Sequence, residues 1–266
     1  MSQTPLKAVV FDWAGTMIDF GCMAPVAAYQ TAFAAEGVQL VAADARRDMG
    51  MAKLAHVKEI LKIERVAEAW RAKTGAAPDE ADALRIYAQL EPLMAASAAE
   101  HSTLIPGAAE TFIELKRRGL KVGSGTGYTR QMMAAILPRA AAQGYTPDAV
   151  VCAGETPTGR PSPQMVWKAL IELDVWPASA VVKVDDAEVG MAEGRNAGCW
   201  TVGVAASGNG VGLSLAEYEV LTEAERRPRV EAAAASLRAA GAHYVIDTVA
   251  DLPALLDEIA ASGRQP

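Results

Sequence analysis

The sequence predicts an α/β fold: a doubly wound parallel sheet with an inserted helical domain. From residue 120 onward, short runs rich in β-branched residues alternate with helical patterns, which is typical of parallel strands joined by crossover helices. Before residue 120, more than a hundred residues separate the first such run from the second, far more than one crossover needs. We therefore predict a core domain formed by residues 1–20 and 100–266, and a helical insert at 21–99.

The strands of the core are predicted from the β-branched runs Leu6–Phe11, Leu120–Ser124, Ala149–Cys152, Ala180–Val184, Trp200–Val204 and His243–Ile246. One crossover helix opens after Pro106-Gly107 and ends at Gly119, preceded by three basic residues that suit a helix carboxyl end. Another is predicted over Ser162–Leu173. In the insert, good helix formers predict helices at Met49–Ile63, Val66–Lys73 and Pro78–Ala95.

Composition excludes several classes of protein. Of the 266 residues, 51% are hydrophobic, which rules out a disordered chain. The net charge of −7 is the wrong sign for a protein that binds nucleic acid or an anionic membrane. The three cysteines are far apart, so we predict neither disulfides nor a zinc site and expect a cytoplasmic protein. No secretory signal is expected at Met1–Pro5, and no membrane span at 196–216.

Polar residues follow four of the predicted strands, at the sheet edge where ligands bind in doubly wound folds. Asp12 follows the first strand and Gly123–Gly127 the second, Arg160 lies in a turn after the third, and Asp185-Asp186 follows the fourth. Each feature alone is more often a turn, a helix cap or a solvated charge. Together they predict a site for Mg²⁺ and a phosphoryl group, because carboxylates hold the metal while a cation and N–H groups hold the anion.

Four motifs, in this order, resemble those of the haloacid dehalogenase superfamily: Asp12-Trp-Ala-Gly-Thr16, Gly123–Arg130, Gly159-Arg-Pro161 and Val184-Asp-Asp186. Within the superfamily the chain is similar to the phosphonatases over nearly its whole length, including Asp19–Pro25, Met49–Lys53 and Glu193–Gly198. The resemblance implies a Rossmann-like core with a helical cap and a bound Mg²⁺. The implied activity is hydrolysis of phosphonoacetaldehyde to acetaldehyde and phosphate in 2-aminoethylphosphonate degradation.

The resemblance also implies a role for each matching residue. Asp12 would be the nucleophile and a metal ligand, with Asp186 and the carbonyl of Ala14 as further ligands. Lys53 would form a Schiff base with the aldehyde. The phosphonate would be held by Thr126 and Arg160, and the site would be lined by His56, Met49, Cys22 and Tyr128.

Two features of the sequence bear on the chemistry. Phosphatases of the superfamily usually carry a second Asp two positions after the nucleophile, to protonate an alkoxide leaving group. This chain has Ala14 there, which fits C–P cleavage because an enamine leaving group needs no proton on oxygen. On the predicted helix, Met49, Lys53 and His56 share one face, which gives the amine an apolar neighbour and a base. Desolvation by Met49 and the nearby charges of Mg²⁺ and Arg160 should lower the pKa of Lys53.

The fourth motif departs from the usual superfamily pattern. Many members have Gly-Asp there and a further Asp four residues later, whereas this chain has Asp185-Asp186 and Gly190. The metal shell is therefore completed either by water or by Asp185. Ser124 is an alternative to Thr126 as the phosphate-binding hydroxyl.

Two other functions fit the same motifs. One is a phosphomonoesterase or phosphomutase of the same fold, which requires another general acid. The other is a non-catalytic ligand-binding or regulatory descendant. The resemblance also implies a homodimer formed through the cap, for which the apolar region of Tyr29, Phe33 and Met51 is a candidate surface.

Overall fold

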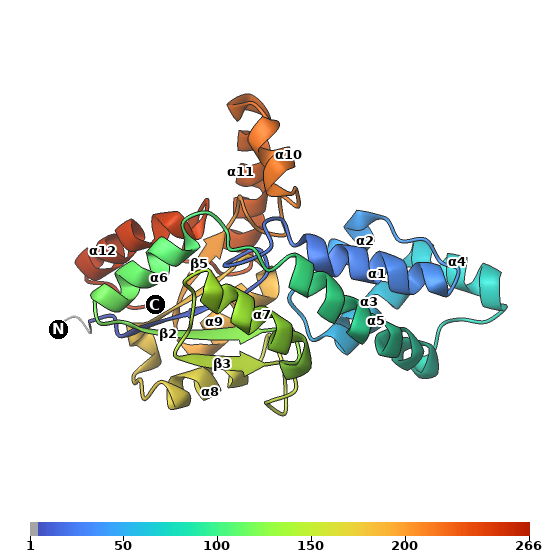
Figure 1. Cartoon of the computed structure of the whole chain (residues 1–266), viewed down its shortest axis with the longest axis horizontal. Helices are drawn as coiled ribbons and strands as arrows, with labels where there is room; N and C mark the ends of the chain where they lie inside the picture. Colours follow the sequence, from blue (N-terminus) through green and yellow to red (C-terminus); the bar gives the residue numbers. More distant parts are fainter. Residues whose placement is uncertain (1–4) are drawn as a thin grey trace.

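The computed structural model describes residues 5–266. The segment Met1–Pro5, for which no secretory signal is expected, lies outside the described residues except for Pro5. Within the described residues, six parallel strands form one sheet in the order β3-β2-β1-β4-β5-β6. Figure 1 shows this sheet with helices around it. The strands are β1 (Ala8–Phe11), β2 (Lys121–Thr126), β3 (Ala149–Cys152), β4 (Val181–Asp185), β5 (Trp200–Val204) and β6 (Tyr244–Ile246). This confirms the predicted fold class, and each strand lies within two residues of its predicted bounds.

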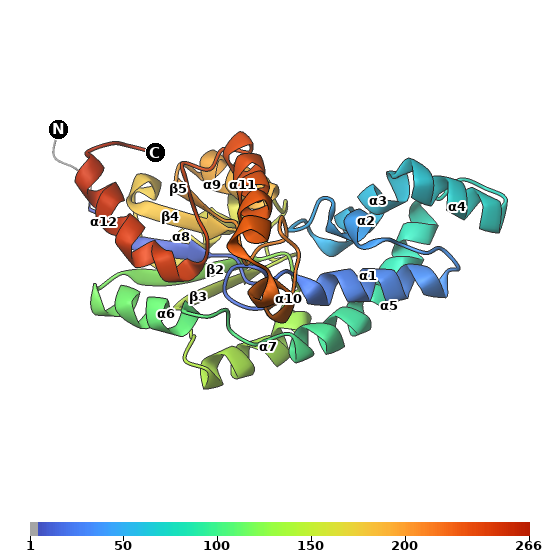
Figure 2. The ribbon, with the colours of Figure 1, turned by 90° about the horizontal axis from the view of Figure 1, so that it is seen from above.

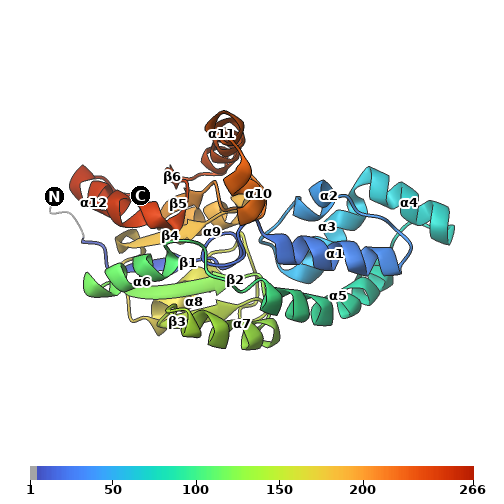
Figure 3. The same cartoon turned by 45° about the horizontal axis from the view of Figure 1, so that its top comes forward.

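The helices fall into two groups. The cap helices are α1 (Met23–Ala35), α2 (Ala42–Arg46), α3 (Lys53–Lys62), α4 (Glu64–Thr74) and α5 (Glu80–Glu100). The core helices are α6 (Ala108–Arg117), α7 (Arg130–Ala142), α8 (Gln164–Glu172), α9 (Glu188–Ala197), α10 (Leu215–Val220), α11 (Glu223–Ala239) and α12 (Leu252–Ser262). Figure 3 shows the cap helices gathered beyond one edge of the sheet, while the core helices surround the strands. Among the described residues, no helix has the length and apolarity that crossing a membrane requires.

Both faces of the sheet are covered, because successive side chains of a strand point to opposite faces. On β1, Val9 and Phe11 belong to the apolar cluster that includes Leu115 of α6 and Leu252 of α12. Their neighbour Val10 belongs to a second cluster, with residues of α8. A strand that is buried on both faces has a nearly continuous apolar sequence, which is why β1 and β4 could be predicted.

The cap is built around α1 and α5, which run side by side (Figures 1 and 2). Tyr29 and Phe33 of α1 are fully buried in the cap's own core. The expectation that these two side chains form an exposed dimer surface is therefore wrong. At its far end α5 packs against α7 of the core, so the cap and the core share one continuous apolar cluster.

The chain enters the cap after a tight turn that Asp19 stabilises. The carboxylate of Asp19 accepts the backbone N–H groups of Met23 and Ala24, both at 3.0 Å, at the start of α1. These N–H groups have no partner inside the helix, so an acidic side chain satisfies them and also suits the positive end of the helix dipole. The chain thus passes from the carboxyl end of β1 at Phe11 into the first helix of the cap at Met23.

Candidate active site

Three carboxylates meet at the carboxyl edge of the sheet. Asp12 follows β1, Asp185 is the last residue of β4, and Asp186 comes next. Because β1 and β4 are paired in register, with Phe11 opposite Val184, the strand ends bring these side chains together. One oxygen from each carboxylate lies within 4.8 Å of the other two. The sheet edge thus carries the acidic cluster that the sequence predicted.

Burial and mutual repulsion raise the pKa of two of these groups. Burial, followed by the charge of Asp185, raises the pKa of Asp12 to about 6 although Arg160 opposes this. Burial, with the charges of Asp12 and Asp185, raises the pKa of Asp186 to about 8. For Asp185, burial is outweighed by Arg160 and Lys183, which lower its pKa. Oxygen donors that repel one another when both are ionised suit a divalent cation, which would stabilise their charged forms.

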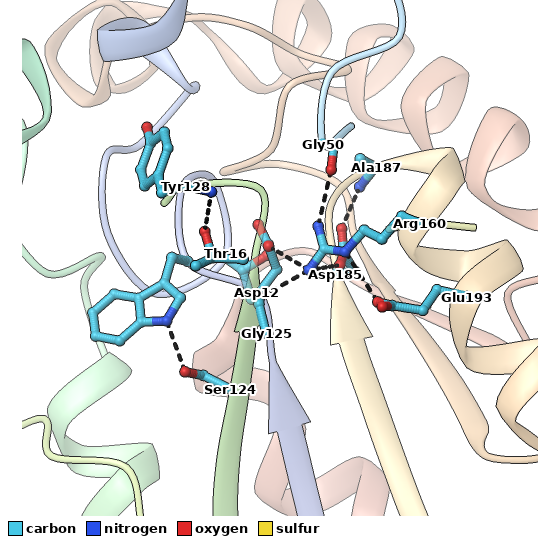
Figure 4. Close-up of polar contacts among 12 residues, drawn as sticks. Asp12, Thr16, Gly50, Ser124, Gly125, Tyr128, Arg160, Asp185, Ala187 and Glu193 are labelled. Carbon is cyan, nitrogen blue, oxygen red and sulfur yellow. Dashed lines mark hydrogen bonds and ion pairs between the residues drawn. The ribbon is translucent and has the colours of Figure 1, made fainter. Parts of the chain in front are cut away.

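The guanidinium of Arg160 lies beside Asp12 (Figure 4) and is 1% exposed. Its Nη2 donates to Asp12 Oδ1 and to the carbonyl of Gly125, both at 2.8 Å. Its Nε donates to Glu193 at 3.0 Å, and its Nη1 lies 3.4 Å from the carbonyl of Gly50 in the cap. These contacts fix a cation next to the acidic cluster, where it can bind an anion.

A narrow cavity of about 20 Å³ separates the acidic cluster from the cap. Its walls include eight of the ten residues predicted from the sequence: Asp12, Ala14, Cys22, Met49, Lys53, Thr126, Tyr128 and Asp186. A space of this size holds about one water molecule, so the site must widen before it can take a larger ligand. A larger cavity, of about 300 Å³, lies at the opposite sheet edge, beside Leu6, Leu120 and Trp200, away from the carboxylates.

Lys53 is the first residue of α3 and reaches this cavity from the cap. Only 4% of it is exposed, and its Nζ lies 5.0 Å from the centre of the Tyr128 ring. Burial lowers the pKa of Lys53 to about 8, although the charge of Asp12 acts in the opposite direction. About a tenth of the amine is therefore neutral at pH 7 and can act as a nucleophile, far more than for a solvated lysine.

The hydroxyl in the wall of the cavity belongs to Thr126, at the end of β2. Its oxygen accepts the backbone N–H of Tyr128 at 3.1 Å. The hydroxyl of Ser124 accepts the indole N–H of Trp13 at 2.7 Å (Figure 4) and is completely buried. Of the two hydroxyls considered from the sequence, Thr126 is therefore the one that faces the site.

Comparison with known proteins places these features in a family. Residues 6–198 match the model of the haloacid dehalogenase-like hydrolases. Over 256 residues the chain is 48% identical to phosphonoacetaldehyde hydrolase from Paraburkholderia phytofirmans, covering 96% of each chain. The chain belongs to the phosphonoacetaldehyde hydrolase family.

Two further relatives agree with this assignment. Phosphonoacetaldehyde hydrolase from Syntrophobacter fumaroxidans is 44% identical over 255 residues, covering 96% of this chain and 92% of that one. The crystal structure of a phosphonoacetaldehyde hydrolase like protein from Oleispira antarctica is 42% identical and superposes with a TM-score of 0.97. It covers 99% of this chain and 97% of its own. Fold and sequence thus match the phosphonoacetaldehyde hydrolase family along nearly the whole chain.

Two of the residues carried over from the phosphonatase motifs lie differently from expectation. Met49 precedes α3 and is not part of it, so the prediction that Met49 and Lys53 share a helix face is wrong. Asp48 and Gly50 adopt positive φ angles of 58° and 91°, which end any helix there. Met49 still lines the cavity, because this turn folds back over the site.

His56 lies on α3 as predicted, yet among the described residues it is not part of the cavity wall. It is completely buried, its ring is 4.5 Å from that of Tyr29, and its Nε2 bonds to the carbonyl of Arg47. Burial, then the charge of Lys53, lower the pKa of His56 to about 3, so its ring is neutral. Through its contact with Arg47, His56 supports the turn that carries Met49.

The structure also places at the site residues to which the sequence analysis gave no role. The backbone N–H of Asn209 donates to Asp186 at 2.7 Å, and the cap residue Arg46 donates to the side chain of Asn209 at 3.1 Å. Two charged residues, Lys183 and Glu193, are fully buried behind Arg160. The sequence held one signal for this buried cluster: Lys183 lies inside an apolar strand, and a buried lysine requires an anionic partner.

Proposed function

We propose that this protein hydrolyses the C–P bond of phosphonoacetaldehyde, giving acetaldehyde and phosphate. The observation that carries the proposal is a buried amine of lowered pKa, Lys53, in the same cavity as Asp12 and Asp186. Hydrolysis of the P–O bond of a phosphate monoester needs no electron sink and gives such an amine no role. The names of the relatives described above support the same substrate.

In the first half of the proposed reaction, the neutral amine of Lys53 adds to the aldehyde, and the adduct takes up one proton and loses water, forming an iminium ion. The positive nitrogen then accepts the electron pair of the C–P bond, so that the organic fragment becomes an enamine. The carboxylate of Asp12 takes the phosphoryl group in line with the departing carbon. Without the iminium, cleavage would leave an unstabilised carbanion.

In the second half, one water molecule hydrolyses the phosphoryl group from Asp12, releasing phosphate. The enamine takes up a proton at carbon, and a second water hydrolyses the resulting iminium ion to acetaldehyde and free Lys53, which releases one proton. Since one water left when the imine formed, the net reaction consumes one water. Cleavage of the C–P bond places no alkoxide on the leaving group, which agrees with Ala14 at the position where a general acid for such an oxygen would stand.

The other residues bind and orient the substrate in this proposal. Arg160 and Thr126 hold the phosphonate oxygens against Asp12, and the side chains of Met49, Cys22 and Tyr128 enclose the aldehyde end. Mg²⁺, held by Asp12, Asp186 and the carbonyl of Ala14, would neutralise charge between two anions and polarise the phosphoryl group. The buried oxygen donors and their unbalanced charge support this choice of cation.

We further propose a cytoplasmic location and a homodimer. The three cysteines are free, which suits a reducing compartment. With Tyr29 and Phe33 inside the cap, Met51 is the residue of the expected dimer surface that remains partly exposed. Sedimentation velocity of the purified protein tests the dimer directly.

The function is tested by comparing phosphonoacetaldehyde with simple phosphate monoesters, measuring phosphate release by wild-type protein and by the Asp12→Asn and Lys53→Arg variants. We expect the wild type to act on the phosphonate alone and both variants to lose this activity. Efficient monoester hydrolysis that survives Lys53→Arg would overturn the proposal in favour of a phosphomonoesterase. No release from either substrate would favour the non-catalytic alternative.

A further inference from the structure

Asp185 is a buried carboxylate whose two oxygens are already occupied. Its Oδ2 accepts the ammonium of Lys183 at 2.6 Å and lies 3.4 Å from Nη2 of Arg160. Its Oδ1 accepts the backbone N–H of Ala187 at 3.1 Å (Figure 4). The side chain is completely buried and, unlike Asp12 and Asp186, is not part of the cavity wall. It therefore lies behind the site and faces the cations that surround it.

The side chain of Asp185 fills the room into which residue 190 would point. A Cβ atom built on Gly190 would lie 2.0 Å from Cγ of Asp185 and 2.2 and 2.4 Å from its oxygens. Gly190 lies within α9 and its φ is not in the left-handed region, so its backbone has no need of glycine. Alanine would be the better helix former there. Residue 190 is a glycine because the side chain of Asp185 occupies the space that any larger residue would need. The two positions at which the fourth motif departs from the usual pattern are therefore one structural feature.

The charges around Asp185 show what this feature does. Lys183 and Arg160 are both fully buried, and Asp185 and Glu193 are the anions that contact them from behind the site. The two cations and two anions balance in charge, so the carboxylate of Asp12, which also contacts Arg160, is the additional negative charge at this place. Removing one partner from a buried ion pair leaves an uncompensated charge, which is strongly unfavourable. Without Asp185, Lys183 would compete with Arg160 for Glu193, and Arg160 would lose a constraint on its position.

We propose that Asp185 is a positioning residue: it neutralises Lys183 and holds Arg160 against Asp12, from the space that a side chain at position 190 would otherwise occupy. Asp185 acts through Arg160 and is not a metal ligand. A carboxylate supplied from Gly190 can take over this task once the side chain at 185 is removed. The effect on catalysis rests on the proposed function, whereas the effects on packing and on anion binding do not.

The test is an exchange of the two residues. Asp185→Gly and Asp185→Asn should each lower kcat/KM by about a hundred-fold and weaken inhibition by inorganic phosphate by about ten-fold, because Arg160 is less well held. Gly190→Asp alone should lower the melting temperature, because two side chains then occupy one space. The double variant Asp185→Gly/Gly190→Asp should recover phosphate inhibition and regain kcat/KM to within about ten-fold of wild type.

Two controls separate positioning from simple loss of structure. Borohydride with acetaldehyde should still label Lys53 in Asp185→Asn, because imine formation does not involve Arg160. Gly190→Ala should lower the melting temperature of the wild type but not that of Asp185→Gly, where its methyl group has room.

The proposal is overturned if a folded double variant is no more active than the better single variant, or if Asp185→Asn keeps wild-type kcat/KM and phosphate inhibition. If the double variant fails to fold, Asp185→Asn alone decides. If the wild type does not act on phosphonoacetaldehyde, the proposed function fails, and the positioning role is judged from phosphate affinity and melting temperatures. Equal destabilisation by Gly190→Ala in both backgrounds would contradict the packing argument.

Discussion

At the scale of single residues, Lys53 combines a charged side chain with surroundings that disfavour its charge. It is 4% exposed and begins α3, where the positive end of the helix dipole also opposes an ammonium group. Burial lowers its pKa to about 8, while Asp12 and Asp186 limit the shift. A nucleophilic amine needs this balance, because a fully solvated lysine would be almost entirely protonated at neutral pH.

The pH dependence of turnover should report this pKa. We expect kcat/KM to rise with pH through about 8, because the neutral amine is the reactive form and its fraction increases as pH rises. Lys53→Arg should lower kcat/KM by roughly a thousand-fold or more, since a guanidinium stays protonated. Rate measurements between pH 6 and 9 at saturating Mg²⁺ provide the profile. A flat profile in the wild type would contradict the role of Lys53.

The acidic cluster should make the metal-free protein sensitive to pH. The pKa values of Asp12 and Asp186 are raised, to about 6 and about 8, so the folded state binds protons more tightly than the unfolded chain does. The free energy of unfolding should therefore fall as pH rises from about 4 to about 8. Adding Mg²⁺ at pH 8 should restore the melting temperature, and EDTA should abolish activity until Mg²⁺ is returned.

Asp186→Asn is the matched variant for this experiment, because it removes the carboxyl group with the higher of the two pKa values. Its metal-free melting temperature should change less between pH 5 and pH 8 than that of the wild type, and Mg²⁺ should raise it less. Thermal unfolding followed by circular dichroism measures both effects. If the metal-free wild type melted at a higher temperature at pH 8 than at pH 5, the raised pKa values of Asp12 and Asp186 would be refuted.

At the scale of elements, the sequence predicted what depends on local patterns. The strand bounds followed from β-branched runs, and the meeting of Asp12 with Asp186 followed from the shared edge of parallel strands. The predicted start of α3 was too early. Met49 and Met51 continue the apolar pattern of the helix toward the N-terminus, although the positive φ of Gly50 places them in a turn. The space shared by Asp185 and Gly190 was not predictable, because it depends on how α9 packs on β4.

The loop after β2 contacts the cap turn so closely that it requires a glycine. A Cβ on Gly127 would lie 2.8 Å from the carbonyl oxygen of Met51 and 3.1 Å from that of Gly50. Backbone atoms cannot move aside as a flexible side chain can, so Gly127→Ala should hold the cap away from the core. We expect kcat/KM to fall by about ten-fold or more, because the position of Lys53 depends on cap closure.

Gly159→Ala is the control for Gly127→Ala, since the nearest atom to its Cβ, that of Ala52, is 3.9 Å away, an ordinary contact. Its kcat/KM should stay within about two-fold of wild type. Both variants should melt close to the wild type, because neither position lies in the apolar core. Wild-type kinetics of Gly127→Ala would show that the closed contact is not needed for catalysis.

At the scale of the whole molecule, the reaction requires a cap that opens and closes. The amine comes from α3 of the cap, whereas Asp12, Arg160 and Thr126 come from the core, so the site is complete only in the closed form. In that form the cavity measures about 20 Å³, too small to admit a substrate. Arg46 of the cap helps to hold this arrangement by donating to the carbonyls of Gly21 and Gly212, at 2.6 and 2.9 Å.

A disulfide between the cap and the core should therefore stop turnover. Ala52 precedes α3, Gly159 lies in the core beside Arg160, and the Cβ atoms of these positions are 3.9 Å apart, within the range that a disulfide spans. When Ala52→Cys/Gly159→Cys is oxidised, substrate cannot enter, so kcat should fall by about a hundred-fold or more, and dithiothreitol should restore it. The single-cysteine variants and the wild type, whose three cysteines are buried, control for oxidation elsewhere. Phosphate release should be followed after mass spectrometry has established the cross-link. Undiminished turnover by fully cross-linked protein would mean that substrate reaches Lys53 without the cap leaving the core.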